Sequence, residues 1–363
     1  MPITEAQVQE ALKSVIDPTT GKDYVAGKAV KGVKVEGDDL TVDIVLGYPA
    51  KSVLERVREQ VAAALRALPG AGAIKVNVGF KITAHAVQGG VERVPGVRNI
   101  VAVASGKGGV GKSTVAVNLA LALAAEGASA GILDADIYGP SQPLMLGLQG
   151  NKPLSTERNS MEPLEAHGIQ AMSIGFLIDV DQPMVWRGPM VTQALEQLLR
   201  FTRWRDLDFL VVDMPPGTGD IQLTLAQKVP VTGAVIVTTP QDIALIDART
   251  GLKMFEKVNI PILGVVENMA LHACSACGHE EHIFGEGGGG RMAADHGVTL
   301  LGSLPLDIRI REQADSGNPT VVSDPASRAA EIYREIARKL AVKIAEKAQD
   351  YGAAFPKIVI KNT

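Results

Sequence analysis

The chain has 363 residues, of which 46% are hydrophobic, and a formal net charge of −4. This length allows two domains with buried cores, and the negative charge argues against broad affinity for nucleic acid or anionic membranes, since both require clustered positive charge. No apolar run approaches the roughly 20 residues that span a bilayer, and the opening MPITEAQVQEALKSV lacks the basic and apolar regions of a signal peptide. We therefore expect a cytoplasmic protein that binds neither nucleic acid nor membranes.

Residues 1–85 predict a small α/β domain. Apolar residues recur at helical spacing in 4–16 and 52–68, and they alternate as in strands in 38–47 and 73–80. The segment that follows, 86–98, is rich in Gly and Val without helical periodicity and predicts a linker.

Residues 99–350 predict a second domain with a doubly wound α/β fold. Short apolar strands alternate with helical segments, which is typical of a mostly parallel sheet covered by helices on both faces. The expected strands are residues 99–105, 129–136, 168–176, 209–215, 233–240, 261–269 and 299–305. Residues 285–290 predict a glycine-rich loop, and residues 326–348 predict an amphipathic helix packed on the sheet. Residues 351–363 predict a terminal tail.

The stretch ASGKGGVGKST, residues 104–114, predicts a phosphate-binding loop because it lies directly between a strand and a helix. Its glycines let backbone N–H groups curl around a phosphate, and the helix dipole adds positive potential. Lys112 would bind the β- and γ-phosphates of ATP, Ser113 would coordinate Mg²⁺, and Thr114 would contact the α-phosphate. The remaining loop residues of this candidate site are Gly106, Gly108, Gly109, Val110 and Gly111.

Three aspartates at the ends of expected strands complete the candidate nucleotide site. Asp213 closes an apolar strand, the usual place for an acid that holds a metal-bound water. Asp134 and Asp136 follow another strand, at the edge where open parallel sheets place their chemistry.

The two cysteines of the chain, Cys274 and Cys277, form a Cys-x-x-Cys pair that predicts a metal site. Two thiolates are half of the set that a four-iron four-sulfur cluster needs, so a twofold dimer would complete a bridging cluster. Zinc is the alternative, held within one chain by both cysteines and two of His279, His282 and His272.

At this point a family resemblance becomes specific. The loop SGKGGVGKST resembles the deviant phosphate-binding loop of nitrogenase iron protein, septum-site regulators and chromosome-partitioning ATPases. The run from Ile100 to about Ile344, with DADIYGPS, VVDMPPGTGD, VVENMA and GSLPLD, most resembles the Mrp (ApbC) iron-sulfur cluster carriers. The resemblance implies a homodimeric ATPase that carries a cluster between its subunits and delivers it to apo-proteins. Its implied partners are these apo iron-sulfur proteins and iron-sulfur assembly factors.

The same resemblance implies roles for single residues. Lys107 would reach across the dimer interface to the phosphates of the other subunit, and Asp136 would orient the attacking water. The adenine would be flanked by Asn268 and by the turn from Pro305 to Asp307. The N-terminal unit resembles the small domain of iron-sulfur assembly factors, but Ala50 stands where many members have a cysteine. This departure favours a docking or regulatory role for the small domain over cluster chemistry.

Two other functions stay open at this level. One is a positioning ATPase that binds a membrane or DNA in its ATP-bound dimer, although such a switch has no use for paired thiols. The other is a nucleotide-dependent chaperone whose metal is structural zinc.

Overall fold

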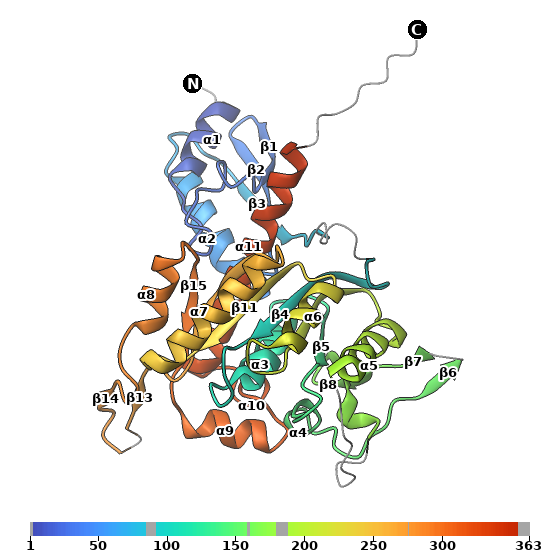
Figure 1. Cartoon of the computed structure of the whole chain (residues 1–363). Helices are drawn as coiled ribbons and strands as arrows, with labels where there is room; N and C mark the ends of the chain where they lie inside the picture. Colours follow the sequence, from blue (N-terminus) through green and yellow to red (C-terminus); the bar gives the residue numbers. More distant parts are fainter. Residues whose placement is uncertain (1–2, 85–91, 158–159, 179–187, 275, 355–363) are drawn as a thin grey trace.

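A computed structural model of the chain describes residues 3–84, 92–157, 160–178, 188–274 and 276–354, and in these ranges it forms two main sheets (Figure 1). The first has three strands and lies in the N-terminal part. The second has eight strands and contains most of the remaining chain. Two further pairs of short strands stand apart: β6 (Ser155–Glu157) with β7 (Ser160–Met161), and β13 (His272–Ala273) with β14 (Glu280–Glu281).

The three-stranded sheet has the order β1-β2-β3 and is covered by two helices. β1 (Val30–Glu36) pairs antiparallel with β2 (Asp39–Leu46), and β2 pairs parallel with β3 (Ile74–Phe80). The helices are α1 (Glu5–Lys13) and α2 (Leu54–Arg66). Every second residue of β2, from Leu40 to Leu46, is buried, as expected for a strand with one face on a core.

The eight-stranded sheet has the order β15-β12-β11-β4-β10-β5-β9-β8. Neighbouring strands are parallel except at one edge, where β8 runs antiparallel to β9. The strands are β4 (Val97–Ala104), β5 (Ala130–Asp134), β8 (Leu164–Ala166), β9 (Ile169–Ser173), β10 (Leu207–Asp213), β11 (Gly233–Thr238), β12 (Ile262–Glu267) and β15 (Leu300–Ser303). This order confirms the doubly wound, mostly parallel α/β fold.

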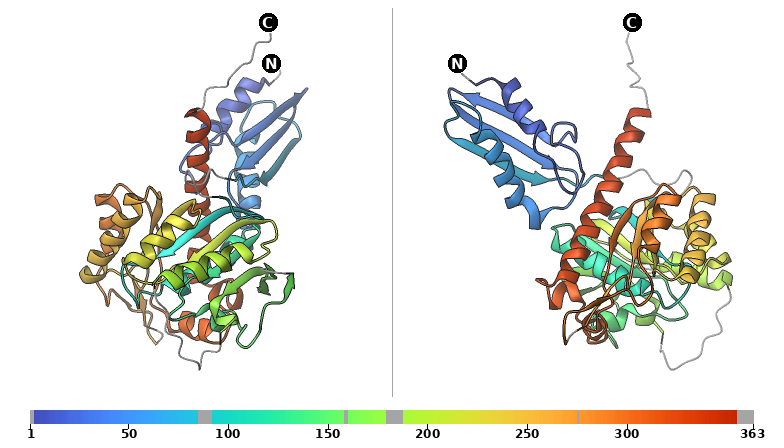
Figure 2. Two further views of the ribbon diagram at one scale, coloured as in Figure 1. Left: turned by 45° about the vertical axis from the view of Figure 1, so that its right-hand side comes forward. Right: turned by 90° about the vertical axis from the view of Figure 1, so that its left-hand side faces the viewer.

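Helices cover both faces of this sheet (Figure 2). One face carries α3 (Lys112–Ala125) and α11 (Arg328–Ala354). The other carries α5 (Gly188–Phe201), α6 (Asp220–Lys228), α7 (Asp242–Lys257) and α8 (Gly288–Asp295). The short helices are α4 (Gln142–Met145), α9 (Ile308–Asp315) and α10 (Thr320–Ser323). No helix in the described ranges combines the length and the apolar character that crossing a membrane requires.

Helix α11 joins the two sheets. It packs on α3 and β15 and then continues beside the three-stranded sheet, as both views in Figure 2 show. The carboxylate of Glu126, which caps the end of α3, is fully buried there. It accepts a hydrogen bond of 2.6 Å from Arg338 of α11 and one of 2.5 Å from the Ser52 hydroxyl of the N-terminal unit. One buried acid therefore ties α3, α11 and the N-terminal unit together.

Replacing Glu126 by alanine is expected to destabilise the protein by about 3–5 kcal/mol, because the substitution leaves the Arg338 guanidinium, itself only 7% exposed, without its buried partner. The measurement is the free energy of unfolding in urea. The exposed pair between Lys22 and Glu346 also links the small unit to α11, at 2.8 Å, and serves as control. Lys22→Met should change that free energy by less than about 1 kcal/mol, and equal losses in the two variants would contradict the assignment.

The structure corrects three details of the sequence prediction. Strands β1 and β8 were not predicted. Val97 and Arg98, assigned to the linker, are the first residues of β4, and residues 86–91 of the predicted linker lie outside the described residues. The tail region begins inside α11, which runs to Ala354, and residues 355–363 also lie outside the described residues. The overall division at 1–85, 86–98, 99–350 and 351–363 stays a prediction.

A further correction concerns the glycine tract 285–290, predicted as a loop. Its second half is the first turn of α8. A Cβ atom on Gly288 would lie 2.7 Å from the Pro240 carbonyl oxygen, and one on Gly289 would lie 2.9 Å from Cβ of Glu267. Glycine is needed at these positions because α8 begins in direct contact with the ends of β11 and β12.

Candidate functional site

The phosphate-binding loop runs from the end of β4 to the start of α3, as predicted. Two positions of the loop require glycine, because atoms of neighbouring elements lie too close to the backbone for a Cβ atom. A Cβ atom on Gly106 would lie 2.1 Å from the backbone carbonyl carbon of Asp247 in α7, and one on Gly111 would lie 2.2 Å from the side-chain nitrogen of Asn268. Gly109 and Gly111 also have positive φ angles, 83° and 81°. The neighbouring elements therefore fix the path of the loop at both ends.

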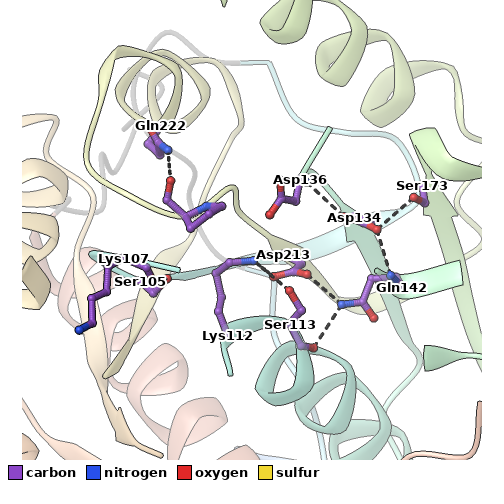
Figure 3. A network of polar contacts seen from close by, with 11 residues as sticks. Ser105, Lys107, Lys112, Ser113, Asp134, Asp136, Gln142, Ser173, Asp213 and Gln222 are labelled. Carbon is purple, nitrogen blue, oxygen red and sulfur yellow. Dashed lines mark hydrogen bonds and ion pairs between the residues drawn. The ribbon is translucent and has the colours of Figure 1, made fainter. Parts of the chain in front are cut away.

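Lys112, the first residue of α3, points into a buried polar network (Figure 3). Its ammonium lies 2.5 Å from Oδ1 of Asp213 and 3.1 Å from the hydroxyl of Ser113. Lys112 is 6% exposed and Asp213 is fully buried. To contact a phosphate, the ammonium has to exchange this carboxylate for phosphate oxygens. The Ser113 hydroxyl and the Asp213 carboxylate are oxygen donors close to one another, which is the donor set that Mg²⁺ prefers, so these residues fit the predicted metal.

The two aspartates after β5 have different surroundings. Asp134 is fully buried and accepts hydrogen bonds of 3.1 Å each from the hydroxyl of Ser173 and the backbone N–H groups of Asp136 and Gln142. Burial and the nearby charge of Asp213 raise the pKa of Asp134 to about 7. Burial also raises the pKa of Asp136. The nearby charge of Lys112 lowers this pKa and that of Asp213 raises it. Asp134 thus supports the backbone that presents Asp136, whose action on an attacking water stays a prediction.

Lys107 does not join this network. In Figure 3 its side chain points away from Lys112 and Asp213, and in the described part of the chain its ammonium has no ion-pair or hydrogen-bond partner. Only its backbone is fixed, because the carbonyl accepts a hydrogen bond of 2.8 Å from the Ser105 hydroxyl. The arrangement leaves Lys107 available to another molecule, and its action across a dimer stays a prediction.

Among the residues assigned to the adenine, Asn268 contacts the loop, and both Asn268 and Asp307 have partners within the chain. The Asn268 amide donates a hydrogen bond of 2.9 Å to the carbonyl of Val110 and so braces the loop from the end of β12. Asp307 caps α9 by accepting a 2.8 Å bond from the backbone of Arg309, whose guanidinium holds the pKa of Asp307 below its usual value. Pro305 is half-buried in the preceding turn. Adenine contact by these residues stays a prediction.

Cys274 and Cys277 lie in the turn of the β13–β14 hairpin, which follows β12. The turn is closed by hydrogen bonds of 2.8 Å from Cys274 N to the carbonyl of His279 and from Gly278 N to the carbonyl of Cys274. Backbone N–H groups of Ala276 and Cys277 lower the pKa of the Cys274 thiol, which favours the thiolate form that metals bind. Cys277 is exposed and Cys274 is partly so. Both sulfurs are therefore accessible at the surface.

The histidines near this turn have partners of their own. Nδ1 of His282 lies 2.8 Å from the carbonyl of Ala270, and Nδ1 of His272 lies 3.0 Å from the carbonyl of Leu306. Among the residues that the structure describes, no group of three or more His, Cys, Asp or Glu side chains is placed to hold a metal ion. The four-ligand zinc site that the spacing allowed is not assembled among these residues.

Sequence reasoning missed Gln142, which lies between Asp134, Ser113 and Asp213 in Figure 3. It also missed Gln222, whose amide donates to the carbonyl of Pro216 and so holds the segment after Asp213. Neither residue belongs to a periodic pattern or a charged pair in the sequence, so no signal identified them.

Comparison with known proteins agrees with this geometry. The family model described as NUBPL iron-transfer P-loop NTPase matches residues 96–341, and the model described as iron-sulfur cluster assembly protein matches residues 5–78. A protein of Salmonella typhimurium named iron-sulfur cluster carrier protein is 52% identical over 339 residues, which are 93% of this chain and 92% of that protein. The mouse iron-sulfur cluster transfer protein NUBPL is 54% identical over 249 residues, 68% of this chain and 78% of that protein.

Solved structures show the same fold. A nucleotide-binding protein from Archaeoglobus fulgidus in complex with ADP is 35% identical with a TM-score of 0.58, covering 66% of this chain and 93% of that one. The cell division ATPase MinD from Pyrococcus furiosus, at 23% identity and a TM-score of 0.51, shows the fold alone, with 69% of this chain and 99% of that chain covered. The chain therefore belongs to the family of NUBPL iron-transfer P-loop NTPases.

Proposed function

We propose that this protein is a cytoplasmic, homodimeric ATPase that binds an iron-sulfur cluster through Cys274 and Cys277 and transfers it to apo-proteins. One observation carries the proposal. The nucleotide loop follows β4 and the cysteine hairpin follows β12, and both strands are parallel members of one sheet. Loop and hairpin therefore lie at the same carboxyl edge, where such sheets place their ligands.

A short connection joins the two sites. Asn268 follows the last residue of β12, binds the carbonyl of Val110 in the loop, and precedes Cys274 by only six positions. Between them, Ala270 N donates a 2.9 Å bond to the carbonyl of Leu304, and the carbonyl of Leu271 accepts a 2.8 Å bond from Leu306 N. A change of the loop on hydrolysis would thus reach the cysteine turn through a braced segment, which is the physical basis for coupling hydrolysis to cluster transfer.

Exposed apolar side chains at this edge support a dimer. Four isoleucines at this edge are 53–65% exposed. They lie at the start of α7, just after the cysteine hairpin in the sequence, and at the start of α9: Ile243, Ile246, Ile283 and Ile308. A second copy that covers this edge would bury them. It would also bring two cysteine pairs together, giving the four thiolates of a four-iron four-sulfur cluster. The same arrangement would present Lys107 to the partner's phosphates.

The test is the iron, acid-labile sulfide and zinc content of protein purified without oxygen, together with its dimer mass. We expect about four iron and four sulfide per dimer, and their loss in the double variant Cys274→Ala, Cys277→Ala. The control is His279→Ala, because this exposed side chain lies next to the pair and should leave the cluster in place. Stoichiometric zinc without sulfide in the unmodified protein would contradict the proposal.

A further inference from the structure

Gln142, at the start of α4, connects the groups that would hold Mg²⁺. Its side-chain nitrogen donates a 2.8 Å hydrogen bond to Oδ2 of Asp213 and a 3.2 Å bond to the backbone carbonyl of Ser113. Its backbone N–H donates to Asp134, at 3.1 Å. The residue is 1% exposed. A single side chain thus ties the predicted Mg²⁺ ligand in α3 to the acid at the end of β10.

The orientation of this amide follows from its partners. Both are acceptors, so the atom that faces them must be the nitrogen. The other atom, Oε1, is buried and has no hydrogen-bond partner in the described part of the chain. An unpaired buried oxygen opposes folding, so the two hydrogen bonds made by the side-chain nitrogen are what favour an amide here. The contacts that favour glutamine at this position are therefore contacts to groups of the nucleotide site.

The contacts of the Asp213 carboxylate indicate what Gln142 does in the site. One oxygen is held by Lys112 and the other by Gln142. When the ammonium of Lys112 moves to a phosphate, its hold on Oδ1 is lost and the Gln142 amide remains on Oδ2. We propose that Gln142 is a positioning residue for Mg²⁺: it keeps the Asp213 carboxylate and the Ser113 backbone in register while Lys112 binds the nucleotide. This inference rests on the proposed binding of ATP with Mg²⁺.

The test compares the binding of fluorescent ADP with Mg²⁺ and with a chelator. In the wild-type protein Mg²⁺ should strengthen binding. In Gln142→Leu the affinity without Mg²⁺ should stay within about twofold, while the strengthening by Mg²⁺ should fall by about tenfold, as expected for losing a hydrogen bond to a charged group. In ATP hydrolysis the half-saturating Mg²⁺ concentration should rise and kcat should fall, with an unchanged KM for ATP at saturating Mg²⁺.

Two further variants keep the test decisive. Gln142→Met makes the same chemical change with an unbranched side chain, in case leucine does not pack. Gln313→Leu is the matched control, because Gln313 in α9 also has a buried, unpartnered Oε1 in the described part of the chain but lies outside the network of Figure 3. It should retain the full effect of Mg²⁺.

The possible results separate this inference from the proposed function. If both Gln142 variants keep the wild-type response to Mg²⁺ and change only thermal stability, Gln142 is structural and the inference is wrong. If the wild-type protein binds ADP equally well with and without Mg²⁺, the Mg²⁺-dependent nucleotide function itself is wrong, and the inference is overturned with it.

Discussion

Replacing Lys112 by alanine is expected to stop ATP hydrolysis and to destabilise the folded protein at the same time. The lysine is the predicted ligand of the β- and γ-phosphates, and losing such a preorganised charge lowers kcat by about 100- to 1000-fold. The same substitution leaves the fully buried Asp213 without its ion-pair partner, which costs about 3–5 kcal/mol. Steady-state hydrolysis and urea unfolding measure the two effects.

A double variant separates the two causes. Adding Asp213→Asn to Lys112→Ala removes the uncompensated charge, and the new side-chain oxygen can still accept the hydrogen bond from Gln142. The free energy of unfolding should recover most of its loss, whereas hydrolysis should not recover.

If cluster transfer proceeds at one rate with ATP, with ADP, without nucleotide and in Lys112→Ala, then transfer is not coupled to the nucleotide.

Replacing Lys107 by alanine is expected to lower kcat about a thousandfold, the effect of removing a cation supplied to phosphates by a second molecule. In contrast to Lys112→Ala, this variant should keep its stability, because among the described residues the Lys107 side chain has no hydrogen-bond or ion-pair partner and points away from Lys112 and Asp213 (Figure 3). Steady-state hydrolysis and urea unfolding of the same preparation make the comparison.

Mixing two inactive variants tests whether Lys107 acts across the dimer. A heterodimer of Lys107→Ala and Lys112→Ala chains contains one site with Lys112 from one chain and Lys107 from the other. Random exchange of equal amounts should therefore restore about a quarter of the wild-type activity. No recovery, in a mixture shown to have exchanged subunits, would mean that Lys107 acts within its own chain.

The parts of the site that lie in one segment were predictable from the sequence. Strand, glycines, lysine, hydroxyl and helix follow one another in residues 97–125, so local patterns were enough to place the loop. Asp213 and Asp134 were predictable because each ends an apolar strand, and parallel strands bring their carboxyl ends to one edge. The structure places the two strands side by side, with Asp213 opposite Asp134.

The contacts between distant segments were not predictable in this way. Gln142 reaches Asp213 across 71 positions and Arg338 reaches Glu126 across 212, and no spacing rule in the sequence relates such pairs. Strand β8 is only three residues long, too short for alternation to be recognised. Strand β1 was missed because its burial does not alternate strictly between exposed and buried positions.

Helix α3 places its two ends at opposite edges of the large sheet. The phosphate-binding loop lies at its first residue, and Glu126, which holds the small sheet, lies at its last turn. In the proposed dimer, which meets through the loop edge, the two small sheets would therefore lie at the outer ends, away from the cysteine pairs. Ala50, fully buried beside the segment that contacts Glu126, would likewise lie away from the proposed cluster. In such a dimer, a partner protein bound to a small domain would not cover the cysteine pairs, so binding a partner and loading it would not compete for the same surface.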